Sequence, residues 1–200
     1  MTLDQYRSVA DRLLGPWVSA ADRLGLSPDQ VSVIAFLVAV GAAGAFAAGS
    51  TALYAAGALL VLLNGWLDLV DGALARHQGI ASDGGDFLDH VLDRYADVAV
   101  IAGLTAGVGA YALGFAAVTG VLLTSYLGTQ IQAVGIGREY GGLLGRADRL
   151  ALIGVVGVVA AIYSAPIVAG LNVVGLLLAL FAVVGHLTAV QRFLGAWSDL

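Results

Sequence analysis

The chain of 200 residues contains no cysteine and no lysine, and charged residues of all kinds make up only 12% of it. The absence of cysteine excludes disulfides and thiolate metal ligands. A water-soluble domain carries roughly 25% charged residues, so the low charge content argues against an ordinary soluble protein. The formal charge of −5 disfavours nucleic acid as a partner, because phosphate backbones attract basic surfaces.

Hydrophobic residues, in contrast, make up 60% of the chain, and the mean hydropathy is +0.91. They form six apolar stretches, each close to the ~20 residues that a helix needs to cross a bilayer. The stretches are Val31–Gly49, Ala52–Val70, Phe87–Gly109, Leu113–Val134, Leu150–Val168 and Val173–Phe193. Runs this long and continuous are typical of helices, whose backbone groups are satisfied within lipid. The sequence therefore predicts an all-α integral membrane protein with six transmembrane helices.

The first 27 residues form a separate element. Their apolar residues recur at helical spacing among aspartates and arginines, which predicts an amphipathic helix lying at the membrane interface. Residues 28–200 would form the six-helix bundle, and residues 1–200 a single domain. Ser27 or Asp29 is available to cap the first membrane helix, and Pro28 suits its opening turn.

The arginines predict the orientation. All of them fall before the first stretch, between the second and third, between the fourth and fifth, near the end of the sixth, or in the polar start of the third. The three opposite connections, around Ser50, Ala112 and Pro166, carry no charge. By the positive-inside rule, both termini are cytoplasmic in this multi-pass protein of the cell membrane. The polar residues described next would then also face the cytoplasm.

Eight residues at the junction of the second and third stretches share a helical spacing. They lie at i, i+3, i+4, i+7 and i+8 on one helix and at i, i+4 and i+8 on the next, so each set forms one stripe. The first set is Asp68, Asp71, Gly72, Ala75 and Arg76, and the second is Gly85, Asp89 and Asp93. Unpaired charge is costly in a membrane, and hard divalent cations bind clustered carboxylates. The stripes therefore predict a metal site.

This spaced pattern resembles, at all eight positions, the signature of the CDP-alcohol phosphotransferases, membrane enzymes of phospholipid synthesis. The resemblance implies transfer of a phosphatidyl or archaetidyl group from a CDP-activated lipid to a polar alcohol, with release of CMP. It implies one or two Mg²⁺ or Mn²⁺ ions bound by Asp68, Asp71, Asp89 and Asp93, with Asp93 also acting as general base. Gly72, Ala75 and Gly85 would leave room for cytidine and pyrophosphate. The resemblance also implies a homodimer.

Arginines extend the predicted site. Arg76 is placed to bind pyrophosphate oxygens through charge-assisted hydrogen bonds. Arg146 and Arg149 resemble the Arg-x-x-Arg element of family members that use inositol phosphate, and Arg192 resembles another basic position in those enzymes. Together they could bind the phosphate of an acceptor; anchoring by the positive-inside rule is the alternative. Gln130 lies on the fourth helix, in a region where those relatives carry basic residues.

Several alternatives stay open at this point. The acceptor is expected to be a phosphorylated polyol, with glycerol 3-phosphate and inositol phosphate fitting equally well, but an unphosphorylated alcohol such as serine is possible. A protein of another class, a divalent-cation transporter, could also use such aspartates. The lysine-free composition resembles that of salt-adapted microbes, which would favour an archaeal CDP-archaeol donor, but a GC-rich genome explains it equally well. Asp97, one turn beyond Asp93, could orient Arg94 or support a metal ligand.

Overall fold

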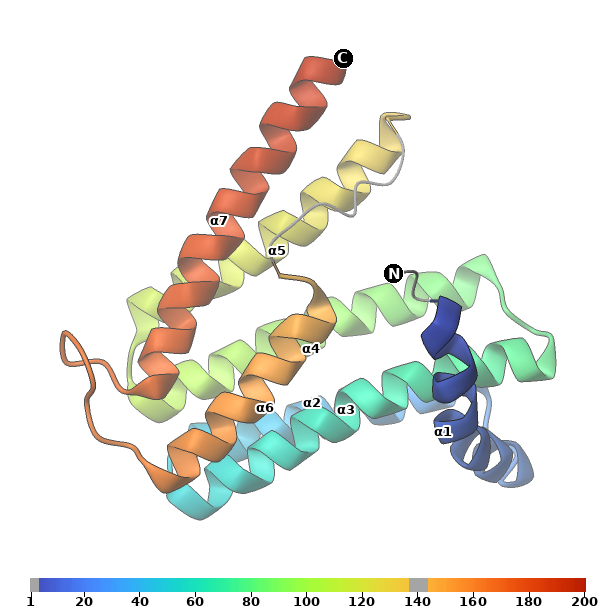
Figure 1. Ribbon diagram of the computed structural model, residues 1–200, viewed down its shortest axis with the longest axis horizontal. Coiled ribbons are helices and arrows are strands. Elements are labelled where there is room, and N and C mark those ends of the chain that lie inside the picture. Colours follow the sequence, from blue (N-terminus) through green and yellow to red (C-terminus); the bar gives the residue numbers. More distant parts are fainter. Residues whose placement is uncertain (1–3, 137–143) are drawn as a thin grey trace.

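The computed structural model describes the backbone of residues 4–136 and 144–200, with side chains from residue 13 onward. Within these residues the chain forms seven α-helices and no strand (Figure 1). The helices are α1 (Asp4–Arg23), α2 (Pro28–Ala47), α3 (Thr51–Gln78), α4 (Asp83–Val108), α5 (Tyr111–Ala133), α6 (Arg146–Ile162) and α7 (Val173–Asp199). The predicted all-α class is confirmed.

The six predicted apolar stretches coincide largely with helices α2 to α7. Four of these helices, α2, α3, α5 and α7, are long and apolar enough to cross a membrane. Helix α4 carries aspartates and an arginine in its first half. Helix α6 has 17 residues, about 26 Å of helix, which is shorter than a typical hydrocarbon core of about 30 Å. The structure thus supports four spans, and spanning by α4 and α6 stays a prediction.

Side-chain caps fix the helix starts that matter for the acidic stripes. Ser27 accepts a hydrogen bond from the Gln30 backbone and donates its own N–H to the Gln30 side chain, with Pro28 in the first turn of α2. Ser82 caps α4 by accepting from the Gly85 N–H at 3.2 Å. Helix α3 ends at Gly79, whose φ of 68° is the left-handed conformation that glycine adopts easily. The short link between α3 and α4 therefore brings the two stripes close together.

Helix α2 packs against both α3 and α4, and α6 lies on α3. Helices α5 and α7 pack on each other and rise together away from the remaining helices (Figure 1). The core residues Phe46, Leu104, Leu178 and Phe181 are at most 1% exposed. This arrangement leaves the end of α3 and the start of α4 beside the start of α6, where the predicted site lies.

Two glycines set how closely α2 and α4 approach. A Cβ at Gly103 would lie 2.3 Å from the backbone oxygen of Ala43, and one at Gly107 would lie 2.2 Å from that of Phe46. Real side chains do not tolerate such distances, so only glycine fits here, as in the small-residue packing of membrane helices. This contact positions α4 against α2 near the end of α4, away from the acidic stripe at its start.

Helix α1 packs on the outside of α3. Leu14 and Val18 are buried against Leu74, whereas Leu13 and Trp17 are 57% and 52% exposed. Apolar side chains therefore cover two neighbouring faces of α1, one held by the protein and one available to a bilayer. Its helical structure is confirmed, and its place at the membrane interface remains a prediction.

Candidate active site

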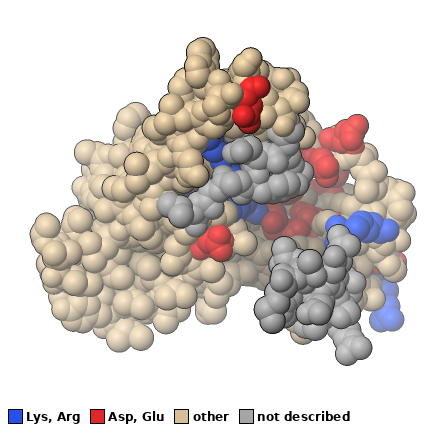
Figure 2. Space-filling view, turned by 45° about the horizontal axis from the view of Figure 1, so that its top comes forward, with Lys and Arg blue, Asp and Glu red and all other residues tan. Residues whose placement is uncertain are grey.

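Three carboxylates converge where α3 ends and α4 begins. Asp68, Asp71 and Asp89 each offer an oxygen, and these oxygens all lie within 4.8 Å of one another. Asp71 is buried, and the other two are partly buried. Because hard cations such as Mg²⁺ and Mn²⁺ prefer clustered oxygen ligands, this donor set fits a divalent metal ion. Acidic and basic side chains gather around a hollow on this face of the molecule (Figure 2).

Asp71 has a buried hydrogen-bond donor that the sequence pattern did not single out. The hydroxyl of Ser32 on α2 lies 2.7 Å from Asp71 Oδ2 and donates to it. Such a bond fixes the rotamer of a metal-ligating carboxylate and leaves its other oxygen for the metal. A signal was present in the sequence, because Ser32 is a polar residue in an apolar stretch, but its partner lies 39 residues away.

The acidic cluster forms one edge of a cleft of about 200 Å³. The cleft lies between the start of α2, the end of α3 and the start of α4, and it is lined by the predicted residues Gly72, Ala75, Arg76 and Gly85 as well as by Asp71 and Asp89. The structure therefore brings two of the predicted metal ligands and the residues predicted to contact the nucleotide together in one cleft.

The glycines of this cleft differ from those of the α2–α4 contact. A Cβ at Gly72 would lie 3.5 Å from Arg76 Nη1, and one at Gly85 would lie 3.5 Å from oxygens of Asp29 and Ser82. These are ordinary van der Waals distances, so packing within the protein does not require glycine at either position. A side chain at either position would instead take up space in the cleft.

Asp93 lies outside the group of three oxygens. It lines a second, smaller cavity together with Asp68 and Asp89. Its Oδ1 is 2.6 Å from Arg146 Nη2, while Arg146 Nη1 is 2.7 Å from Asp68 Oδ2. One guanidinium thus bridges α3 and α4 from the start of α6. Asp93 therefore differs from the other three in lying outside their oxygen cluster, although it shares Arg146 with Asp68.

The three arginines predicted to hold an acceptor phosphate have different surroundings. Arg146 lies against Asp68 and Asp93. Arg149 is buried on α6 and donates to Asp97 Oδ2 at 2.7 Å. Arg192 on α7 donates to the backbone oxygen of Thr124 at 2.5 Å. Burial of Arg149 argues against a purely anchoring role, because anchoring arginines reach toward the membrane surface.

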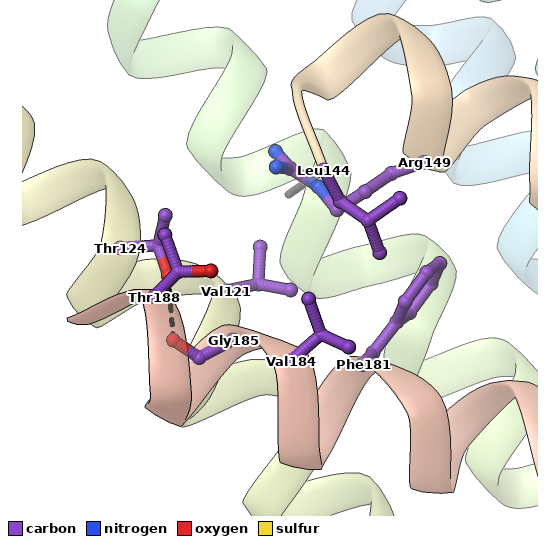
Figure 3. A pocket seen from close by; sticks show the side chains of 8 residues that line it. All are labelled: Val121, Thr124, Leu144, Arg149, Phe181, Val184, Gly185 and Thr188. Atoms are coloured by element: carbon purple, nitrogen blue, oxygen red, sulfur yellow. Dashed lines mark hydrogen bonds between the residues drawn. The ribbon is translucent and has the colours of Figure 1, made fainter. Parts of the chain in front are cut away.

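Arg149 lines a cavity between α5, α6 and α7 (Figure 3). The cavity is small and is also lined by Val121, Thr124, Leu144, Phe181, Val184, Gly185 and Thr188. Arg94 on α4 lies between Asp93 and Asp97, at 3.6 and 3.4 Å, and donates to the hydroxyl of Ser125. The predicted pairing of Asp97 with Arg94 is therefore present, but the pairing of Asp97 with Arg149 was not expected from the sequence.

Comparison with known proteins is consistent with this geometry. Residues 25–195 match the CDP-alcohol phosphatidyltransferase family. The chain is 33% identical over 199 residues to the archaetidylinositol phosphate synthase of Methanothermobacter thermautotrophicus, an alignment that covers 99% of this chain and 95% of that protein. It is 35% identical over 155 residues to the phosphatidylinositol phosphate synthase of Mycolicibacterium smegmatis, covering 74% of this chain and 68% of the relative.

Solved structures show the same fold. The crystal structure of Mycobacterium tuberculosis phosphatidylinositol phosphate synthase with CDP-DAG bound superimposes with a TM-score of 0.79 at 28% identity, covering 93% of this chain and 94% of that one. The same enzyme in complex with manganese and citrate gives a TM-score of 0.79 at 26% identity, covering 92% and 88%.

Proposed function

This chain belongs to the CDP-alcohol phosphatidyltransferase family. From that premise we propose that it transfers a phosphatidyl or archaetidyl group from a CDP-activated lipid to a hydroxyl of inositol phosphate, releasing CMP. The main support for the proposal is the group of three carboxylates, whose oxygens lie within 4.8 Å of one another, beside the cleft between α2, α3 and α4. The alternative function, a divalent-cation transporter, is not favoured, because the family consists of enzymes.

The cleft would hold the nucleotide end of the donor. Gly72, Ala75 and Gly85 leave its walls free of bulky side chains, and Arg76 is exposed at its rim, where it would bind pyrophosphate oxygens. Asp68, Asp71 and Asp89 would hold Mg²⁺ or Mn²⁺, as their oxygen donor set suits either ion. When bound, the metal supplies positive charge next to the pyrophosphate; two ions are expected by analogy with paired phosphoryl-transfer sites.

Asp93 would act on the acceptor. Its position one turn further along α4 places it beside the cluster, and it would accept the proton of the attacking hydroxyl as that oxygen bonds to the β-phosphorus. The bond from this phosphorus to the bridging oxygen breaks, and CMP leaves with the electron pair. A phosphodiester between lipid and acceptor remains. Arg146, in contact with Asp93 and Asp68, would contribute to orienting Asp93.

Inositol phosphate is favoured as acceptor by the relatives. The aligned archaeal and mycobacterial enzymes are named for inositol phosphate products. Arg149, buried in the cavity between α5, α6 and α7, would bind the acceptor phosphate with Arg146 and Arg192. Glycerol 3-phosphate would use the same contacts, whereas serine has no phosphate to place there.

The arrangement in the membrane is part of the proposal. The polar ends of α3 and α4 and the start of α6 all lie on the arginine-rich side, which by the positive-inside rule is cytoplasmic. We expect residues 28–200 to form one membrane-embedded domain of the plasma membrane, with residues 1–27 at its interface. A homodimer is expected from the family.

The test is CMP release by the purified full chain in detergent. CDP-diacylglycerol and CDP-archaeol are each offered with inositol 1-phosphate, glycerol 3-phosphate or serine, with Mn²⁺ or Mg²⁺ present, and the lipid product is identified by mass spectrometry. We expect metal-dependent CMP release with inositol 1-phosphate. Release with serine alone would contradict the assignment of a phosphate-binding pocket, and no release with any acceptor would contradict the proposed reaction.

A further inference from the structure

Asp97 is the acid whose burial the reaction does not explain. It lies on α4 with its side chain only 4% exposed. A carboxylate in such a place is costly unless it is paired. Its Oδ2 accepts a hydrogen bond of 2.7 Å from Arg149 Nη2 and lies 3.4 Å from Arg94 Nη1. Asp97 thus joins an arginine of α6 to an arginine of its own helix.

The remaining side of Arg149 faces the cavity between α5, α6 and α7. Arg149 Nε is buried and has no hydrogen-bond partner among the described residues, and the same is true of Thr188 Oγ1 on the opposite wall. Both residues line this cavity, as Figure 3 shows. Buried polar atoms are usually paired, so a donor and a hydroxyl left open on one cavity indicate a polar ligand there.

We infer that Asp97 is a positioning residue for the acceptor: it holds Arg149 with its free N–H toward the cavity in which the acceptor phosphate binds. The inference rests on the proposed function, because it takes Arg149 as an acceptor contact. Arginine loses rotamer entropy when its side chain is fixed. Because the buried carboxylate of Asp97 already fixes Arg149, binding of the acceptor does not have to supply that entropy cost.

Asp97 also lies next to the proposed base. Arg94, which Asp97 contacts, is 3.6 Å from Asp93. The two ends of the chain of contacts, Arg149 at the acceptor and Asp93 at the metal site, are therefore joined through Asp97 and Arg94. On this inference, the acceptor phosphate and the acceptor hydroxyl would bind at opposite ends of this series of polar contacts on α4 and α6.

The experiment is a double-mutant cycle on the full chain. Asp97→Asn, Arg149→Gln and the double variant are assayed for KM of inositol 1-phosphate and of the CDP-lipid, with thermal stability recorded for each. We expect Asp97→Asn to raise the acceptor KM roughly tenfold, equivalent to ~1.4 kcal/mol, and to leave the donor KM within about twofold. In the Arg149→Gln background, Asp97→Asn should add nothing, because it acts through Arg149.

Further variants keep the test decisive if Asp97→Asn does not fold. The double variant removes both buried charges together, and Asp97→Glu keeps the charge while moving the carboxylate by one methylene. For Asp97→Glu we expect a smaller increase in acceptor KM, again without a change in donor KM. Thr105→Val is the matched control: Thr105 is buried on the same helix, its hydroxyl bonds to the Ile101 carbonyl, and both KM values should stay unchanged.

Three results would overturn the inference. If Arg149→Gln raises the acceptor KM but Asp97→Asn does not, Asp97 has no positioning role, and the proposed function stands. If Asp97→Asn raises donor and acceptor KM equally, or adds its full effect to Arg149→Gln, its role is structural. If Arg149→Gln leaves the acceptor KM unchanged, the acceptor site itself is wrong, and the inference fails with it.

Discussion

At the residue scale, the four aspartates are not equivalent. Asp68, Asp71 and Asp89 form one oxygen cluster, while Asp93 is ion-paired with Arg146 beside it. Helical spacing placed all four on two stripes but could not predict which of them cluster. That depends on how α3 and α4 cross and on where the Arg146 side chain lies, and both follow from the packing of the helices and not from spacing along one helix.

We therefore predict different losses for Asp89→Asn and Asp93→Asn. Asp89→Asn should abolish turnover and weaken Mn²⁺ binding, because it removes a ligand. Asp93→Asn should lower turnover by about 10²–10⁴-fold, the usual contribution of a general base, while Mn²⁺ and CDP-lipid still bind. CMP release and Mn²⁺ titration measure the two effects. Turnover close to wild type in Asp93→Asn would remove the base assignment.

Ser32 gives a second prediction at this scale. Ser32→Ala removes the hydroxyl that donates to Asp71 at 2.7 Å, so Asp71 loses its fixed orientation. Partners of metal ligands of this kind are worth about 10–100-fold in metal affinity, and we expect a loss in that range by Mn²⁺ titration. Ser50→Ala is the control, because Ser50 caps α3 at its far end and should affect only stability. Unchanged Mn²⁺ affinity in Ser32→Ala would show that Asp71 needs no support.

At the element scale, the contact between α2 and α4 and the cleft use glycine for different purposes. Gly103 touches the backbone of Ala43, whereas Gly85 has room for a Cβ within the protein. Sequence spacing predicted that Gly85 belongs with the acids. It could not identify the packing role of Gly103, since the partner lies on a helix 60 residues earlier in the chain.

Alanine at Gly103 should therefore affect stability, and alanine at Gly85 should affect binding of the CDP-lipid. Gly103→Ala forces α2 and α4 apart and should cost about 1–3 kcal/mol of stability, the usual range for overpacking, seen as a lower melting temperature. Gly85→Ala should leave the melting temperature unchanged and raise the KM for the CDP-lipid, because its methyl group enters the cleft. A stability loss in Gly85→Ala with an unchanged donor KM would assign Gly85 to packing.

At the scale of the whole molecule, hydropathy predicted where the helices lie in the sequence. It predicted six membrane spans, of which the structure supports four. All six predicted stretches became helices, because long apolar runs leave few alternatives. Helix α4 is the exception in composition: its first half carries the acids of the site, so its hydropathy is low although it lies in the bundle. Helix α6 begins at Arg146, within the polar cluster, which shortens its apolar part. The sequence predicted the two acidic stripes, but the partners of Arg146 and Arg149 depend on the packing of α6 on α3, from which both side chains reach carboxylates of α4.

The orientation in the membrane can be tested directly, because the chain has no cysteine. Single cysteines at Ser50, Ala112 and Pro166 should react with an impermeant maleimide added outside intact cells, since these positions lie in the uncharged connections or, for Ala112, in the adjoining first turn of α5. Cysteines at His77, in the last turn of α3, and at Ser82, in the link between α3 and α4, should react only after the membrane is opened. The expected pattern follows from the positive-inside rule, by which the arginine-rich ends stay in the cytoplasm. CMP release by each variant serves as the control for folding. Labelling at His77 from outside would reverse the orientation and place the nucleotide cleft on the side of the membrane away from the cytoplasm.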